Sequence, residues 1–535
     1  MTTTQQQPAA TPSAGAFAPF RSRAFRVIWT ATLISNIGMW MKDVASGWLM
    51  TELSPSPLMV ALVQAALTLP IFLLALPAGA VADIVDRRRL LVAVQSLIAL
   101  VAVALALAVV ADVMAPWVLL ALTFLGGVGA ALAAPAFQAA VPDLVDKATL
   151  RSAVALNSMG INVARAIGPA LGGLVLATAG VAAAYALDAL STLVVVAAFL
   201  WWRPPLRQTA LPPESLGSAI ATGVRYAAAS PELKAVLLRA GVFFLFASAY
   251  WALLPLIARD QLGGGSTYYG FLLTALGAGA VTGALSLPHL AKRASPDVLV
   301  TVGTLLTASV TAVLGLVPNK ALAPILLFLA GAAWIAVLTN LNVAAQSILP
   351  NWVRARGLAI YLTVFYGAMT LGSAIWGQIA SMLSLSAALV IAAACATVIG
   401  GIATLVRLPK GEADLTPSLH WPELAHSAVE DHRGPVLIEI TYTVPAELRD
   451  AFIPAAVAFS RRRRRDGAFG WRLLEDPNEP GRFLEVFFAA SWLEHLRQHS
   501  RVTKSDAEAQ AALAGFHRSA TPPEVRHWVG MSHPH

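Results

Sequence analysis

Over the first 410 residues, long apolar stretches alternate with short polar links. Twelve stretches of about 20 residues are separated by links that carry charged or helix-breaking residues. An apolar helix of this length crosses the hydrocarbon core of a bilayer, because it pairs every backbone N–H and C=O internally. The pattern predicts an all-α polytopic membrane protein with twelve transmembrane helices, at 25–50, 58–80, 90–111, 115–138, 152–178, 181–202, 235–258, 267–290, 298–317, 321–345, 356–382 and 384–407.

Lys and Arg are concentrated in every second link. One set of links holds little positive charge, whereas each member of the other set is basic, as at Arg87 to Arg89 and at Lys292 with Arg293. Cytoplasmic loops of membrane proteins carry the excess of Lys and Arg. We therefore expect the basic links and both termini to be cytoplasmic.

The link at 203–234 is longer than the others and divides the helices into six and six. It contains four prolines, and after them Leu216, Ile220, Val224 and Ala227 recur at helical spacing. This predicts a cytoplasmic linker with a helix at the membrane interface, between six-helix bundles at 21–202 and 235–410. Such a 6+6 repeat suits a transporter whose two bundles rock about a site at the midplane.

The chain changes character outside the bundles. Residues 1–20 are polar and rich in Gln, Ala and Pro, which predicts a disordered tail without a signal peptide. Residues 411–535 show strand patterns at 436–444, 468–475, 482–490 and 525–529, with helices after the first and third strands. This βαββαβ order predicts a small ferredoxin-like α+β domain in the cytoplasm.

Composition agrees with a membrane protein and limits the partners. The chain is 57% hydrophobic and only 12% charged, about half the charge of a soluble protein. Residues 1–410 carry a net charge of +11 and residues 411–535 a net charge of −3. The basic excess therefore reflects topology, and we expect no nucleic-acid partner. Cys395 is the single cysteine, which excludes an intramolecular disulfide.

A charged motif stands in the link between the second and third spans. It reads Gly-Ala-Val-Ala-Asp-Ile-Val-Asp-Arg-Arg-Arg from residue 79 to residue 89. It resembles the signature loop of the major facilitator superfamily, Gly-x-x-x-Asp-Arg/Lys-x-Gly-Arg-Arg/Lys, which implies a two-bundle transporter fold. Ile84 replaces a usual base and Asp86 replaces a glycine, so we expect a weaker conformational latch. The gating residues implied by the resemblance are Gly79, Asp83, Asp86, Arg87 and Arg88.

The fifth span contains a second motif, Gly-Pro-Ala-Leu-Gly-Gly at 168–173. Proline removes a backbone donor, and glycines let neighbouring helices approach closely. The motif resembles the core of the superfamily's antiporter motif, which implies export. The alternative is a helix that is merely well packed. The predicted bend residues are Gly168, Pro169, Gly172 and Gly173.

Further segments resemble one branch of this superfamily, the bacterial transmembrane secretion effector group. They are residues 36–49, Asn157 to Arg165, and residues 350–357. The tail resembles the antibiotic-biosynthesis-monooxygenase-like domain that members of this branch append. The resemblance implies a location in the bacterial inner membrane and proton-driven efflux of a small organic molecule.

Charged residues inside the predicted spans are candidate functional groups. Each costs about 2.5–3.5 kcal/mol at the centre of a helix by insertion scales, so it normally faces a cavity or a partner. We expect Asp43 to carry the coupled proton and Arg165 to bind an anionic group or an acid such as Asp188. The alternative is a static ion pair. The candidates are Asp43, Lys42, Arg165 and Asp188, with His289 and Arg239 near span ends.

Aromatic and amide side chains in the spans suit a bulky, partly apolar substrate, although each is individually also typical of helix packing. The candidate cavity residues are Asn36, Trp40, Gln64, Asn157, Asn162, Tyr250, Trp251, Asn340 and Tyr366, with Trp48, Asn342 and Trp376 as further members.

The tail offers weaker signals. His495 and His499, four residues apart on a helix, invite a metal site, but no complete ligand motif follows, so we predict neither metal nor cofactor. Arg461 to Arg465 either contact anionic lipid or form a solvated helix end, and we favour lipid. We expect a non-catalytic domain that regulates or dimerises.

Three functions remain open from the sequence. The first is proton-coupled export of a small molecule, and the second is import on the same fold. The third is a membrane-anchored oxygenase or sensor that acts through the tail. The chain contains no ATP-binding Gly-x-x-x-x-Gly-Lys-Ser/Thr loop, and we expect a transporter rather than an enzyme.

Overall fold

The computed structural model describes residues 15, 17–203, 216–350, 352–409, 414–416, 418 and 433–530. The membrane part consists of helices α1 (Arg23–Leu53), α2 (Pro57–Ile84), α3 (Arg87–Val110), α4 (Pro116–Leu144), α5 (Leu150–Trp201), α7 (Pro231–Leu256), α8 (Ser266–Leu290), α9 (Pro296–Leu316), α10 (Ala323–Ser347), α11 (Arg354–Met382) and α12 (Leu385–Ala403). A shorter helix, α6 (Leu216–Ala229), precedes α7.

These helices account for the twelve predicted spans. Within the described chain, ten helices are long and apolar enough to cross a membrane, and α5 is counted once among them. Helix α5 contains two spans, because Gly180 interrupts it with φ +81°, a left-handed conformation that favours glycine. Helix α1 is the remaining span; it is 31 residues long, and Asn36, Lys42 and Asp43 lower its apolar character.

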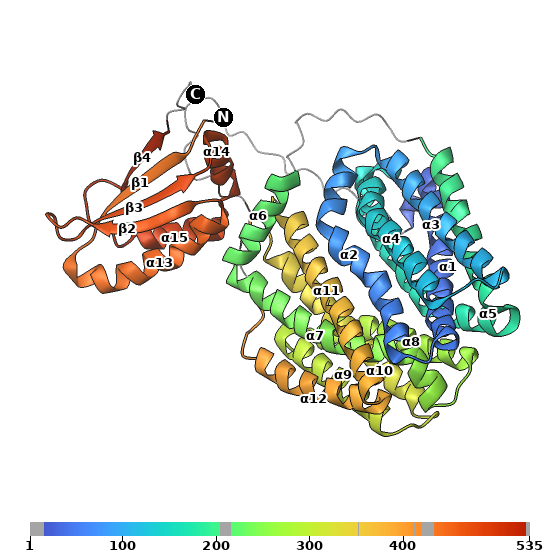
Figure 1. Cartoon of the computed structure of the whole chain (residues 1–535). Helices are drawn as coiled ribbons and strands as arrows, with labels where there is room; N and C mark the ends of the chain where they lie inside the picture. Colours follow the sequence, from blue (N-terminus) through green and yellow to red (C-terminus); the bar gives the residue numbers. More distant parts are fainter. Residues whose placement is uncertain are drawn as a thin grey trace.

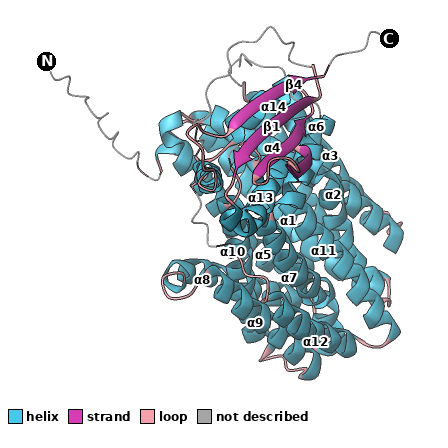
Figure 2. Ribbon diagram, turned by 90° about the vertical axis from the view of Figure 1, so that its left-hand side faces the viewer, coloured by secondary structure: helices cyan, strands magenta, loops and turns pink. Residues whose placement is uncertain are grey.

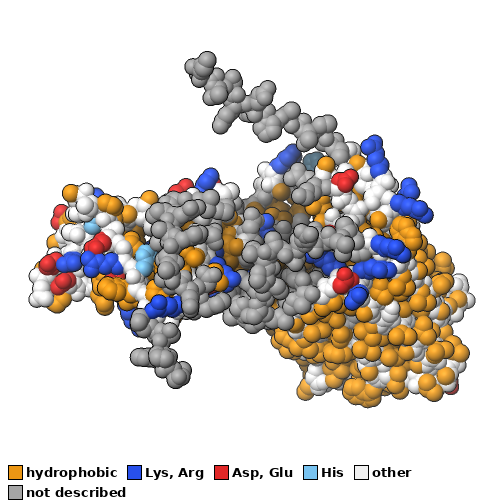
Figure 3. Space-filling model, turned by 90° about the horizontal axis from the view of Figure 1, so that it is seen from above, with side chains coloured by type: hydrophobic (Ala, Val, Ile, Leu, Met, Phe, Trp, Pro, Cys, Tyr) orange, Lys and Arg blue, Asp and Glu red, His pale blue; other side chains and the backbone are white. Residues whose placement is uncertain are grey.

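The helices form two bundles (Figures 1 and 2). Helices α1 to α5 pack on one another in the first bundle, and α7 to α12 pack on one another in the second. The bundles meet where α2 packs on α11 and where α5 packs on α8. Hydrophobic side chains cover the flank of this helical part (Figure 3), as expected of a surface that faces lipid.

The predicted N-terminal tail ends earlier than residue 20. A short 3-10 helix covers Ala18–Arg21, and the Phe20 ring lies edge-on to Trp29 at 5.0 Å between centroids. An aromatic side chain that packs on α1 orders this end of the segment. Residues 1–14 lie outside the described residues.

Beyond the bundles, four strands form one antiparallel sheet: β1 (Val436–Thr443), β2 (Phe469–Glu475), β3 (Arg482–Ala489) and β4 (Glu524–Val529). Their order is β2-β3-β1-β4, that of a ferredoxin-like fold. Helices α13 (Arg449–Arg465), α14 (Trp492–Arg501) and α15 (Lys504–Ala514) complete the domain. Alternate residues of β1 and β3, including Ile438 and Phe487, are buried together with Phe452 of α13.

This tail domain contacts the membrane part through α6 and the link between α10 and α11. The Arg501 guanidinium lies 4.6 Å from the Trp352 ring centroid, and Arg225 of α6 lies 3.8 Å from Glu494. Tyr226 of α6 is buried and donates a hydrogen bond to the Ile348 carbonyl. Tyr226 and Ala227 of α6 thus pack against protein, whereas Val224 on the same helix is half exposed, and the predicted place of α6 at the membrane interface stays a prediction.

Arginines of the run at the end of α13 also form ion pairs within the protein. Arg462 and Arg465 lie 2.7 and 2.6 Å from the Asp506 carboxylate, and buried Arg463 lies 3.5 Å from Glu485. Because these three guanidinium groups pair with carboxylates of the same domain, the predicted contact of the whole run with lipid is wrong.

Candidate functional site

The first candidate site is a group of three charges between α1 and the second half of α5. The Lys42 ammonium lies 2.6 Å from the Asp43 carboxylate, and Lys42 is buried. Asp188 is only 1% exposed and interacts electrostatically with both residues. Its Oδ2 atom has no hydrogen-bond partner among the described residues. The site therefore combines one cation with two carboxylates, one of which is incompletely paired.

Close packing of the helices positions these charges. A methyl group added at Gly38 would lie 2.4 Å from the Ser191 hydroxyl and 3.1 Å from the Asp188 Cα. Only glycine allows this approach of α1 to α5. The Ser46 and Tyr185 hydroxyls lie 3.1 Å apart beside the charges, so polar groups continue along the same helix contact.

The second candidate site surrounds Arg165 of α5, at the boundary between the bundles. The Arg165 guanidinium lies 5.9 Å from the Trp40 ring centroid, and Tyr366 of α11 lies near it. Among the described residues, Arg165 forms no ion pair. Asp188 interacts with Lys42 instead, so the structure does not support the predicted pairing of Asp188 with Arg165.

An aromatic cluster on the second bundle extends this site. Tyr366 contacts Phe365, with 4.4 Å between ring centroids, and Phe365 lies 4.1 Å from Phe244 of α7. Trp334 of α10 lies 5.2 Å from Phe244 and 5.3 Å from Trp251. Sequence reasoning found Trp251 and Tyr366 but missed Phe244, Trp334 and Phe365. The adjacent aromatic residues at 243–244 and 365–366 were the available signal.

The proline–glycine motif of α5 packs against both bundles. A methyl group at Gly172 would lie 2.9 Å from the Met41 Cα in α1, and one at Gly173 would lie 2.8 Å from the Gly270 Cα in α8. Gly168 is similarly close to the Trp40 side chain. The motif thus fixes Trp40 beside Arg165 and forms the crossing of α5 with α8.

The predicted gating loop is held within the first bundle. Arg87 lies 3.1 Å from Asp143 of α4, and Arg88 donates hydrogen bonds to the Phe199 and Leu200 carbonyls at the end of α5. Asp86 caps α3 by accepting a hydrogen bond from the Arg89 N–H. A methyl group at Gly79 would meet no described atom within 4 Å, so no described helix packs closely on this glycine. The Asp83 side chain lies outside the described part.

The other predicted cavity residues are not all brought together. Tyr250 is completely buried in the core of the second bundle, which makes it a packing residue in this conformation. Asn162 and Asn340 donate hydrogen bonds to carbonyls of their own helices. Asn36, Gln64 and Asn157 are half-buried. Arg239, a further predicted charge, links α7 to Asp297 and Thr301 of α9 and to the Ala403 carbonyl.

Contacts between the bundles occur toward the end of the spans opposite the basic links. The Leu58 N–H donates to the Ser381 hydroxyl at 3.0 Å, and the Trp48 and Tyr269 rings stack at 6.1 Å between centroids. Deeper in the spans, the Thr68 and Thr370 hydroxyls lie 2.7 Å apart. These contacts join α1 and α2 to α8 and α11.

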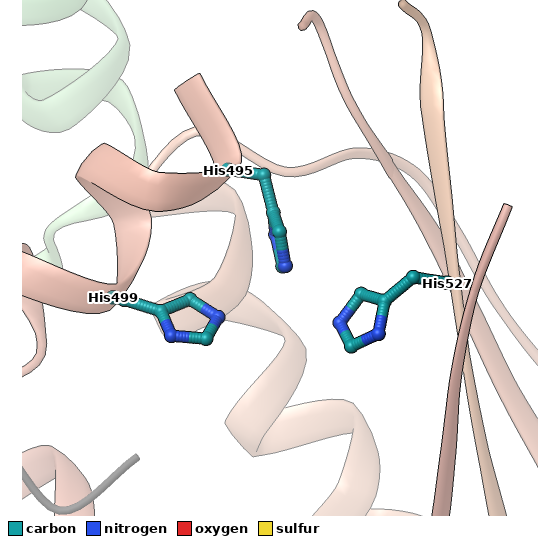
Figure 4. Close-up of side chains that lie close together, drawn as sticks. All are labelled: His495, His499 and His527. Carbon is teal, nitrogen blue, oxygen red and sulfur yellow. The ribbon is translucent and has the colours of Figure 1, made fainter. Parts of the chain in front are cut away.

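The tail domain contributes two further features. A basic cavity of about 580 Å³ lies between α6 and the domain, lined by Arg225, Lys234, Arg461 and Arg464. On its sheet, His527 lies beside His495 and His499 (Figure 4), which the sequence had not connected.

Two bundles of membrane-spanning helices, with Arg165, Trp40 and Tyr366 at their boundary, define a transporter of the major facilitator superfamily. The chain belongs to one family of that superfamily, the transmembrane secretion effectors, whose sequence profile matches residues 14–535. The predicted family and fold class are therefore confirmed.

Relatives and solved structures agree with this assignment. The chain is 28% identical over 371 residues to the enterobactin exporter EntS of Shigella boydii and of Escherichia coli, which covers 68% of this chain and 86% of the relative. A bacterial homolog of the human lysosomal transporter Spinster superposes with a TM-score of 0.59 at 16% identity, over 72% of this chain and 97% of that chain. A POT family transporter in complex with 5-aminolevulinic acid reaches a TM-score of 0.61 at 14% identity, over 75% and 99%.

Proposed function

We propose that this transporter exports a small organic molecule from the bacterial cytoplasm in exchange for protons. The observation that carries the proposal is the placement of Lys42, Asp43 and Asp188 in the first bundle, close to the Arg165 site at the bundle boundary. The same helix, α1, carries Trp40, Lys42 and Asp43. Substrate binding at Trp40 and proton binding at Asp43 can therefore influence each other through a single rigid element.

Asp43 is the proposed proton carrier. Its side chain is 23% exposed, whereas that of Lys42 is 10% exposed, so Asp43 is the member of the pair that water reaches. Protonation of Asp43 would leave Lys42 with Asp188 as its remaining carboxylate. When Asp43 is protonated, the charged partner of Lys42 is Asp188 of α5 and no longer Asp43 of its own helix. Proton binding is therefore coupled to the contact between α1 and α5.

Arg165, Trp40 and the half-buried rings of Trp251, Phe365 and Tyr366 form the proposed substrate site, whereas Phe244 is fully buried and packs within the second bundle. A guanidinium binds an anionic or catechol-type oxygen, and aromatic faces pack on a planar substrate. A substrate that extends from Arg165 to Tyr366 would contact both bundles, so its binding would affect how the two bundles pack on each other. The relationship to an enterobactin exporter makes a catecholate siderophore the first candidate, with drugs and secondary metabolites as alternatives.

Export also requires a defined orientation. The charge pattern supports cytoplasmic basic links and cytoplasmic termini. With that orientation, the contacts at Leu58–Ser381 and Trp48–Tyr269 close the outer end, and the substrate site is loaded from the cytoplasm. Import on the same fold is the second candidate, and the direction of transport distinguishes the two.

The deciding experiment uses inverted membrane vesicles with an acidified interior and a pH-sensitive dye. We would add catecholate siderophores, lipophilic cations and aromatic antibiotics to wild type, Asp43→Asn and Arg165→Ala. Substrate-dependent proton release in wild type, lost in both variants, is the expected result. Accumulation of labelled substrate without any proton movement would refute antiport, and substrate movement in the opposite direction would show import.

A function that resides in the tail is tested by truncation after Lys410. Because the described contacts of the Arg165 site involve only α1, α5 and the second bundle, we expect the truncated protein to retain transport. Retained transport eliminates an oxygenase or sensor whose membrane part is only an anchor.

A further inference from the structure

We propose that His495, His499 and His527 form a zinc site in the tail domain. One ring nitrogen from each histidine lies within 4.8 Å of the corresponding nitrogens of the other two (Figure 4). His495 and His499 project from one face of α14, one helical turn apart, and His527 comes from β4. The inference is independent of the transport mechanism, because none of these residues belongs to the membrane helices.

The sheet register explains how His527 reaches the helix. His527 pairs with Ile438 of β1, and paired residues of neighbouring strands point to the same face of a sheet. Ile438 is buried in the core between sheet and helices. His527 therefore points toward α14, and the His495 and His527 ring centroids lie 4.8 Å apart.

His495 is the member that most needs a ligand. It is only 2% exposed, and its ring nitrogens make no hydrogen bond of good geometry to a described residue, although the Gln498 side chain lies beside the ring. A buried imidazole without partners loses the hydrogen bonds that it makes in water. The rings of both neighbours, His499 and His527, are half-buried, so an ion can reach the three histidines from solvent.

The protonation state also suits metal binding. Metal binds the uncharged imidazole, and the buried position of the His495 ring disfavours the charged form.

Zinc fits this donor set best. Imidazole nitrogens bind Zn²⁺ at about 2.0–2.1 Å in a tetrahedron, which places them about 3.4 Å apart. No pair of the three nitrogens therefore needs to approach by more than roughly 1.4 Å on binding. Three histidines leave the fourth position to water. An ion there would tie β4, an edge strand of the sheet, to α14.

The test uses the full-length protein without a histidine tag, purified in detergent, stripped with chelator and titrated with Zn²⁺ against a chromogenic competitor. We expect one ion per chain and a Co²⁺ derivative with the visible absorption of a tetrahedral site. His527→Gln and His499→Gln should each weaken Zn²⁺ binding about 100-fold or more. His517→Gln is the matched control, because both His517 ring nitrogens already contact backbone atoms of Thr443 and Thr521.

Amide hydrogen exchange of β1 and β3 checks that the variants remain folded, and Zn²⁺ should slow exchange in β4 of wild type alone. Absence of tight Zn²⁺ binding by wild type would overturn the proposal. Binding that persists in folded His527→Gln and His499→Gln proteins would also overturn it, since the ion would then occupy other residues.

Discussion

Single residues set the chemistry of the proposed cycle. The cost of placing charge in a membrane was enough to select Lys42, Asp43, Arg165 and Asp188 from the sequence. The sequence did not show which of these charges interact with each other, because a rotation about a helix axis moves a side chain to a different neighbour. The structure pairs Lys42 with Asp43, places Asp188 within electrostatic range of both, and puts Arg165 beside Trp40 and Tyr366.

At the scale of single residues, Asp43→Asn should lower the rate of substrate-coupled proton movement by about 10-fold or more, because an amide cannot carry the proton. The dye assay in inverted vesicles measures the effect. Asp112→Asn is the matched control: Asp112 lies in the α3–α4 link with φ +55°, a conformation that Asn tolerates, so we expect full activity. Equal loss in both variants would contradict a specific role for Asp43.

At the scale of elements, glycine determines where helices cross. Gly173→Ala places a methyl group 2.8 Å from the Gly270 backbone and should force α5 away from α8. We expect the free energy of unfolding to fall by about 1–3 kcal/mol and transport to fall with it. Gly401→Ala in α12 is the control, because no described atom lies within 4 Å of the added methyl group. Thermal unfolding and transport assays on both variants provide the comparison, and an undisturbed Gly173→Ala protein would show that the crossing adapts.

The tail domain presents a second prediction at this scale. The sheet face away from α13 exposes Phe469, Leu474 and Trp528, at 48%, 50% and 54%. We propose that this face dimerises the protein, since exposed apolar patches mark interaction surfaces. Leu474→Asp should convert dimers to monomers in light scattering of the detergent-solubilised protein. Val457→Asp, on the exposed side of α13, should leave the dimer intact, and a wild-type monomer would refute the proposal.

Helix positions followed directly from the sequence, and Gly180 marks the division of α5 that the apolar pattern predicted between 178 and 181. The position of α6 did not follow. Its apolar stripe fits a membrane surface and a protein partner equally well; in the structure Tyr226, outside that stripe, packs on Trp352, while Val224 of the stripe is half exposed.

For the whole molecule, alternation between states requires the bundles to move apart at the contacts described. Thr68→Cys combined with Thr370→Cys, in a Cys395→Ala background, should form a disulfide, because the two hydroxyl oxygens lie 2.7 Å apart. Oxidation should then stop transport by joining α2 to α11, and reduction should restore it. Each single-cysteine variant should transport under both conditions. Undiminished transport by the fully cross-linked protein would show that this contact persists throughout the cycle.

The sequence by itself determined the membrane spans, the two bundles and the ferredoxin-like tail, because each depends on local hydrophobic periodicity and on the cost of burying backbone and charge. Only the tertiary structure decided which distant side chains meet. The aromatic cluster around Phe365, the pairing of α13 arginines with Asp506, and the approach of His527 to His495 all depend on helix rotation and strand register. Those quantities are fixed by packing between segments far apart in the chain, and local patterns do not encode them.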